Sequence, residues 1–103
     1  MTNTYPKTPV LATILDRPSA PRVIQLKGKT ARTLRALVDK GAYGITALEM
    51  SNTWALRIAD YVHTLRHTHN ISILMVKEPH EGGWHARYIL QSNVTLQEPE
   101  TEV

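Results

Sequence analysis

Four polar residues in the middle of the chain carry side chains that could read the edges of nucleic-acid bases. They are Ser51, Asn52, Thr53 and Arg57. Asparagine can form a paired hydrogen bond with adenine and arginine with guanine, and each such pair gives about 1–3 kcal/mol of discrimination. Structural roles are open as well, because Ser51 and Asn52 are good helix-capping residues and Arg57 could pair with Asp60.

Basic side chains lie on both sides of this segment in the sequence, two before it and three after it. They are Lys29, Arg32, Lys77, His85 and Arg87. Cations of this kind can contact phosphates, and each such contact changes the salt dependence of binding by about one unit. The alternative is that the later three belong to a solvated strand edge, where charge prevents association between strands.

Charge is unevenly distributed along the chain. The 103 residues carry 12 Lys and Arg against 9 Asp and Glu, a net charge of +3. Three of the acids fall in the last six residues, so residues 1–97 have a net charge of +6. A basic body with an acidic tail fits a polyanionic partner such as nucleic acid.

The residue types needed for catalysis or metal binding do not come together. The sequence has no Cys, so thiolate chemistry and disulfides are excluded. His63 and His67 have the spacing of metal ligands on a helix, but no suitably placed acid completes a set. No nucleophile triad, phosphate-binding glycine loop or pair of catalytic carboxylates stands out. We therefore expect a protein that is not an enzyme and that uses no cofactor, metal or small-molecule substrate.

The elements that would position these side chains begin near residue 30. Apolar spacing predicts a first helix over residues 30–40, with Thr30 as its cap and Gly41 at its end. The run Thr46-Ala47-Leu48-Glu49 matches a capping box and predicts a short second helix over 47–50. A third helix over 53–67 is predicted from one apolar face, formed by Ala55, Ile58, Ala59, Val62 and Leu65.

A β-hairpin is predicted after the third helix. Residues 71–78 and 84–91 have strand composition and flank a loop over 79–83, and Asn70 can take a left-handed conformation before them. At the other end of the chain, four prolines before residue 28 forbid a long helix. Residues 10–15 could form a helical turn or a strand and 22–26 a short strand, within an arm that we expect to be poorly ordered.

Three helices followed by a twisted hairpin are the element order of a winged helix-turn-helix. The sequence thus predicts an α+β fold with a flexible arm over 1–27, a winged helix-turn-helix domain over 28–92 and an acidic tail over 93–103. The third helix would enter the major groove and the hairpin, or wing, would lie beside it. A homodimer is usual for such readers, yet no apolar helix remains to build one, so a monomer or a weak dimer through the N-terminal arm is an equal alternative.

Segments of the sequence also resemble the small winged helix-turn-helix proteins of bacteriophages and prophages. These segments are Ala36-Leu37-Val38, Gly44-Ile45-Thr46-Ala47-Leu48-Glu49, Arg57-Ile58-Ala59-Asp60-Tyr61-Val62-His63-Thr64-Leu65-Arg66 and Gly82-Gly83-Trp84-His85-Ala86-Arg87-Tyr88-Ile89-Leu90. The resemblance covers about residues 34–91. It implies sequence-specific binding of double-stranded DNA by a regulator of transcription or DNA processing, in the cytoplasm of a bacterial or phage-infected cell.

Two other functions are compatible with the same fold. A winged-helix interaction module would bind a host or phage protein through Trp54, Leu56 and Tyr61. Single-stranded nucleic acid could instead bind on the aromatic side of the hairpin. A membrane role is not expected, because the longest apolar run has four residues, Ile73 to Val76, and a membrane span needs roughly 20.

Overall fold

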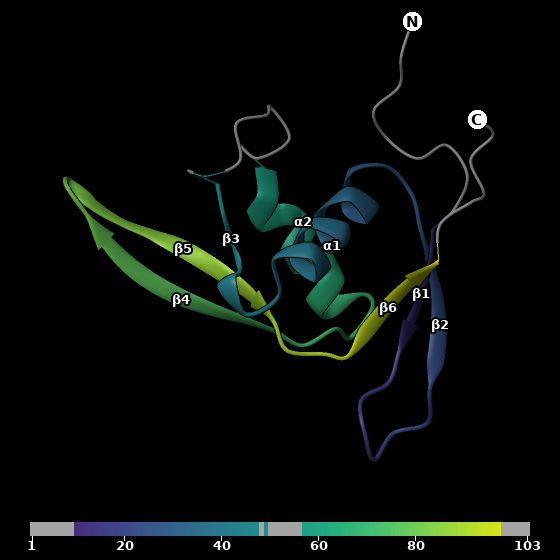
Figure 1. The fold of residues 1–103 in the computed structure, drawn as a ribbon. Helices are drawn as coiled ribbons and strands as arrows, with labels where there is room; N and C mark the ends of the chain where they lie inside the picture. The colour runs from purple at the N-terminus through teal and green to yellow at the C-terminus, as the bar shows by residue number, and fades with distance from the viewer. Residues whose placement is uncertain (1–9, 48, 50–56, 98–103) are drawn as a thin grey trace, which may run out of the picture.

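The computed structural model describes residues 10–47, 49 and 57–97 (Figure 1). Its elements, in chain order, are β1 (Val10–Ile14), β2 (Arg22–Leu26), α1 (Gly28–Lys40), the 3-10 helix η1 (Gly41–Tyr43), β3 (Ile45–Thr46), α2 (Ile58–His67), β4 (Ile73–His80), β5 (Gly83–Leu90) and β6 (Val94–Gln97). Within the described residues, the strands form two antiparallel three-stranded sheets with the orders β2-β1-β6 and β3-β5-β4. The α+β class is therefore as predicted.

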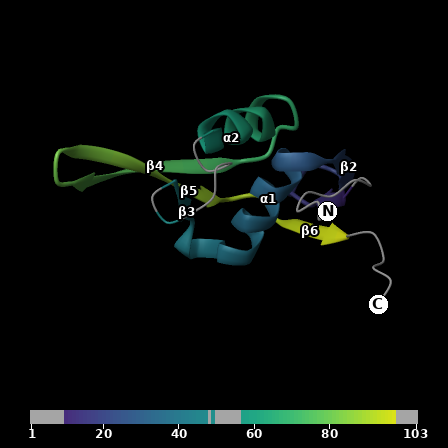
Figure 2. The same ribbon diagram turned by 90° about the horizontal axis from the view of Figure 1, so that it is seen from above.

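The core lies where the two helices meet the inner ends of both sheets. Figure 2 shows α2 on one side of the β4–β5 hairpin, with η1 and the end of α1 on the other side. Leu34 and Leu37 of α1 and Leu65 of α2 are fully buried between them. Both sheets contribute to the same cluster, β1 through Ile14 and β3 through Ile45. Burial of these branched side chains is the main stabilising term of the fold.

Helix α1 begins earlier than the sequence predicts. The Ala31 N–H donates to the Lys27 carbonyl oxygen at 3.4 Å, so the first turn forms before Thr30 and the cap predicted at Thr30 is wrong. Its far end is as expected, because Gly41 has a positive φ of 52° and its N–H bonds to the Leu37 carbonyl oxygen. Glycine adopts such a φ without the steric cost of a Cβ.

The prediction of three helices is corrected, since the described residues contain two α-helices and the short η1. Ala47 and Glu49, placed by the sequence in a second helix, lie in a turn, and residues 48 and 50–56 fall outside the described part. The Thr46 hydroxyl still accepts a hydrogen bond from the Glu49 N–H at 3.1 Å, as a capping box requires. No helix in this described part is long and apolar enough to cross a membrane.

Helix α2 corresponds to the C-terminal part of the predicted third helix. Ile58, Val62 and Leu65 are buried at helical spacing, as expected, whereas Ala59 is exposed. Asn70, just after the helix, has a φ of 55°, which confirms its predicted left-handed conformation. This residue turns the chain from α2 into β4.

The β4–β5 hairpin has a tighter turn than the predicted loop over residues 79–83. Its register continues to the pair His80 and Gly83, so Glu81 and Gly82 alone make the turn. Pro79 lies inside β4, which is an edge strand of its sheet, and edge strands are where proline is tolerated within sheets.

The prediction of a flexible arm over 1–27 is wrong for residues 10–26, and the prediction of a separate tail over 93–103 is wrong for residues 94–97, which form β6. β1 is the central strand of its sheet and pairs with β2 on one side and β6 on the other. Val10, Ala12 and Ile14 point from β1 into the core. The prolines at 18 and 21 lie in the loop between β1 and β2, so they interrupt neither strand.

A polar cluster joins the end of β1 to the start of β6. The Ser92 hydroxyl donates to Asp16 Oδ2 at 2.6 Å, and the Asn93 N–H donates to Asp16 Oδ1 at 3.0 Å. The same Ser92 oxygen accepts from the Ser72 N–H at 2.8 Å. These bonds lower the pKa of Asp16, so its carboxylate stays charged and holds three chain segments together.

Candidate nucleic-acid interface

Arg57 stands immediately before α2 with its side chain in solvent. Its Nε and Nη2 donate to Asp60 Oδ2 at 3.2 and 3.1 Å, which is the pairing that the sequence left open as an alternative. Both side chains are about two-thirds exposed, 69% and 65%. An exposed ion pair of this kind contributes about 0–1 kcal/mol. Arg57 can therefore exchange Asp60 for another acceptor at little cost.

The other three predicted base-reading residues, Ser51, Asn52 and Thr53, lie outside the described residues. Further polar groups come from α2 itself, where His63, Arg66 and His67 are exposed. The His63 and His67 rings lie 4.3 Å apart between centroids. Sequence reasoning passed over Arg66, although its position three residues after His63 indicates the same exposed side of the helix.

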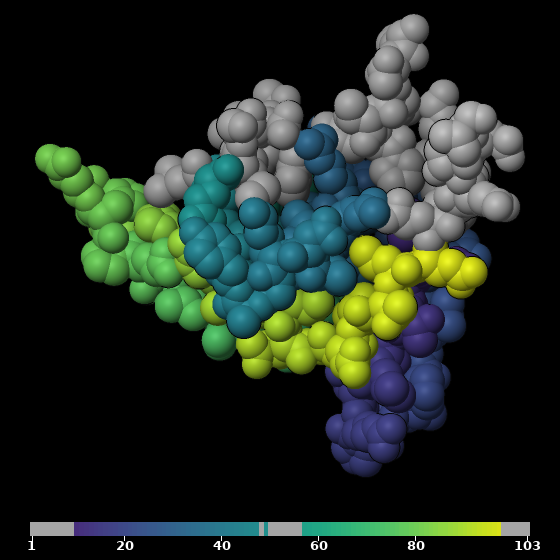
Figure 3. Space-filling view, viewed as in Figure 1, coloured from purple at the N-terminus to yellow at the C-terminus, as the bar shows by residue number. Residues whose placement is uncertain are grey.

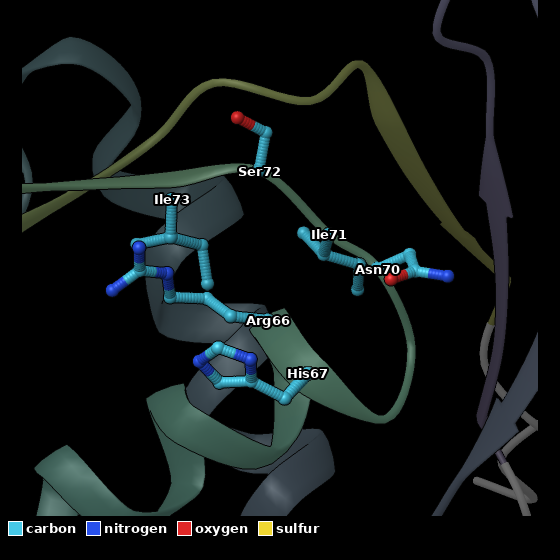
Figure 4. Close-up of a pocket in the computed structure, with 6 residues that line it drawn as sticks. All are labelled: Arg66, His67, Asn70, Ile71, Ser72 and Ile73. Carbon is cyan, nitrogen blue, oxygen red and sulfur yellow. The ribbon is translucent and has the colours of Figure 1, made fainter.

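A shallow hollow of about 270 Å³ lies at the C-terminal end of α2 (Figure 4). Arg66 runs beside the side chain of Ile73 there, and the Ser72 hydroxyl points the other way. Ile73 thus faces α2. Among the described residues, no group of three or more His, Cys, Asp or Glu is arranged to hold a metal ion.

The two faces of the hairpin follow from its register. Ile73, Lys77 and Trp84 belong to the face that lies toward α2, because side chains alternate along each strand and Pro79 is paired with Trp84. Trp84 is 54% exposed, with Lys77 Nζ 4.7 Å from its ring centroid. Lys77, one of the predicted phosphate contacts, therefore lies on the face of the hairpin that is toward α2.

His85 and Arg87 share the opposite face of the hairpin, as their alternation predicts. Arg87 Nε donates to Glu78 Oε2 at 2.6 Å, and its Nη1 and Nη2 donate to Glu49 Oε1 and Oε2 at 3.2 and 3.1 Å. Nη1 also donates to the Tyr43 carbonyl oxygen at 3.0 Å. The sequence analysis treated Arg87 as a phosphate contact or as part of a solvated strand edge. In the structure, its hydrogen-bond partners belong to the protein itself.

His85 extends this network toward the tip of the hairpin. Its Nε2 lies 2.9 Å from Glu78 Oε1, and its Nδ1 lies 2.8 Å from Nδ1 of His80. The two rings are nearly parallel, at 11°. A hydrogen bond between two ring nitrogens requires one Nδ1 to donate its proton and the other to accept it. The predicted phosphate contact at His85 is thus a member of an internal hydrogen-bond chain.

The charges of this network are mutually stabilised. Hydrogen bonds from Arg87 hold the pKa of Glu49 and the pKa of Glu78 below their ordinary value. The same two carboxylates raise the pKa of Arg87. All three groups are therefore ionised near neutral pH.

Lys29 and Arg32, the remaining predicted contacts, lie on the first two turns of α1, where Lys29 is exposed and Arg32 is half-buried. They belong to a different element from Arg57 and Lys77. Of the apolar residues proposed to bind a protein partner, Tyr61 packs against the core, and Trp54 and Leu56 lie outside the described residues.

Comparison with known proteins identifies the fold family. The model of a winged helix domain matches residues 23–100, a range that begins in β2 and includes both helices, the hairpin and β6. No curated protein and no solved structure matches the chain. The winged helix is in general a DNA-binding fold, in which a helix and a hairpin approach the duplex together. The chain belongs to the winged helix domain family.

Proposed function

We propose that the protein binds double-stranded DNA in a sequence-specific manner, through α2 and the face of the β4–β5 hairpin that lies toward it. The observation that carries this proposal is the placement of Lys77 and Trp84 on the same side of the hairpin as α2, within a winged helix domain. A helix fits the major groove, and a cation on the neighbouring hairpin reaches the adjacent backbone.

Arg57 is the proposed base-reading residue, because it is exposed and its bond to Asp60 is weak. Ser51, Asn52 and Thr53 precede it and complete the proposed reading segment. Lys77 is the proposed phosphate contact of the hairpin, with Lys29 and Arg32 as a second group on α1. The +6 charge of residues 1–97 supports attraction to the DNA backbone.

The biological role proposed is that of a phage or prophage regulator of transcription or DNA processing, working in the cytoplasm and without catalysis. The support is the resemblance of residues 34–91 to such proteins. Binding as a monomer and binding as a homodimer are both compatible with this role.

Selection of duplexes from a random pool tests the proposed function directly. Wild type is expected to enrich a defined sequence and to lose affinity steeply with salt. Arg57→Ala should lose preference at one base position, at a cost of about 1–3 kcal/mol. Arg17→Ala, which removes the same charge from the exposed loop after β1, is the matched control and should keep the preference. A pool that stays random would overturn the proposal.

A further inference from the structure

We propose that Arg87 is a positioning residue, which fixes the angle of the hairpin against the body of the protein and thereby sets its affinity for duplex DNA. Arg87, Glu49 and Glu78 are called the Arg87 clamp below. The inference rests on the proposed DNA binding and deepens it, since it concerns a group on the face of the hairpin away from α2.

The clamp joins three separate elements through one guanidinium. Glu78 lies on β4, Arg87 on β5, and Glu49 in the turn that follows β3. The two carboxylates and the Tyr43 carbonyl oxygen all accept hydrogen bonds from Arg87. The Arg87 side chain is only 15% exposed, and its Cζ lies 4.8 Å from the Tyr43 ring centroid. A planar group with several fixed donors suits such bridging, and a lysine ammonium does not.

The backbone alone provides a short attachment at this point. β3 and β5 share two residue pairs, Ile45 with Tyr88 and Thr46 with Arg87. From Arg87 toward the tip, β5 pairs only with β4 in the described part of the chain. The clamp therefore acts where the hairpin leaves the body, and Figure 3 shows the hairpin extending outward from there.

Geometry makes the angle at Arg87 important for any contact farther out. Gly83 lies four positions before Arg87 on β5, a distance of roughly 13 Å at the strand rise of about 3.3 Å per residue. A rotation of roughly 15° at Arg87 would displace the tip by about 3–4 Å. Productive binding contacts tolerate displacements of about 0.5 Å. Fixing the hairpin thus preserves the position of Lys77 and Trp84 relative to α2.

The charge of the clamp separates positioning from direct phosphate contact. Two carboxylates surround one guanidinium, so their combined charge is −1 and the group would repel a phosphate. If Arg87 contacted DNA, removing either carboxylate would release it and strengthen binding. If Arg87 holds the hairpin, removing either carboxylate weakens binding, even though the protein becomes more positive.

Affinity for the selected duplex is measured by fluorescence anisotropy over a range of salt concentrations, for wild type, Glu49→Gln, Glu78→Gln and Arg87→Lys. Glu81→Gln is the matched control, since it removes one acid from the exposed turn of the same hairpin. We expect all three clamp variants to bind roughly 3- to 30-fold more weakly than wild type. The slope of log affinity against log salt should stay unchanged, and Glu81→Gln should bind at least as well as wild type.

Stronger binding by Glu49→Gln and Glu78→Gln would overturn the positioning role. So would binding by Arg87→Lys as tight as that of wild type, because lysine keeps the charge for a phosphate contact but loses the bridging hydrogen bonds. Each variant is measured below its melting temperature, checked by circular dichroism, so unfolding is not read as weaker binding. Residual dipolar couplings provide a readout without DNA. In wild type, the amide couplings of β4, β5 and α1 should fit a single alignment, as expected for one rigid body. In Glu78→Gln, the couplings of β4 and β5 should no longer fit the alignment of α1. If Glu78→Gln loses this common alignment but wild type binds no duplex, only the proposed function is overturned. If the couplings of Glu78→Gln equal those of wild type, the positioning role of the clamp is overturned.

Discussion

At the residue scale, conformation and contact explain why particular side chains occupy particular places. Gly44 has a φ of 76°, and a Cβ there would lie 2.6 Å from the Tyr88 carbonyl oxygen and 2.8 Å from Ile89 Cγ1. The close approach lets the chain between η1 and β3 lie directly against β5, next to Arg87. Two separate reasons, backbone conformation and space, thus favour glycine at this position.

Gly44→Ala is expected to destabilise the protein by roughly 2–4 kcal/mol, because it combines backbone strain with a collision against a strand. Gly28→Ala is the matched control. Its φ is 65°, yet a Cβ at that position would meet no described atom within 4 Å. It should therefore cost only the strain, about 1–2 kcal/mol. Urea denaturation measures both, and equal losses would contradict the role of the close approach.

At the element scale, the β4–β5 hairpin depends on charged groups as well as on its backbone ladder. Glu49 and Glu78 both have a folded-state pKa below the ordinary 4.5, chiefly through hydrogen bonds from Arg87. A carboxyl group with a lowered pKa stabilises the folded state above its unfolded pKa. That contribution is lost as the pH falls through the lower, folded-state value.

The free energy of unfolding should consequently decline as the pH falls below about 4.5. The double variant Glu49→Gln and Glu78→Gln should show a shallower decline, because it has lost two of the groups that titrate. Urea denaturation between pH 3 and 6 measures these slopes. A double variant whose stability declined in parallel with wild type would show that the clamp carboxylates do not stabilise the fold.

At the scale of the whole molecule, the sheet β2-β1-β6 unites segments from both ends of the sequence. Its inner face supplies Val10, Ala12 and Ile14 to the core shared with both helices. The outer face is more open, and Val23 on β2 is 60% exposed there. The residues before α1 are therefore part of the folded unit rather than an appendage.

Ile14→Ala should cost about 2–5 kcal/mol in the free energy of unfolding, because it leaves a cavity at a buried position. Val23→Ala, on the exposed face of the neighbouring strand, should change stability by no more than about 0.5 kcal/mol. The comparison uses the urea midpoints of the two variants. Similar values for both would indicate that β1 contributes little to the core.

Local patterns in the sequence were enough to predict α1, the hairpin and the conformation of Asn70, because periodicity and turn chemistry act over a few residues. The pairing of β1 with β6 was not predictable in this way, since Ala12 and Leu96 are brought together by the fold alone. Two partners of Arg87, Glu49 and Tyr43, were missed for the same reason, because they lie 38 and 44 residues away. Alternation placed His85 and Arg87 on one face correctly, but it could not say which face looks toward α2.

The pairing of β1 with β6 also determines where an attached group would sit. Leu11 is opposite Gln97, so the first and last described strands reach the same corner of the sheet. In Figure 1 this corner and the tip of the hairpin lie at opposite sides of the molecule. A dye, bead or reporter joined at Leu11 or Gln97 would begin far from the wing, and tethering the protein to a surface through that corner would leave the wing accessible to an incoming duplex.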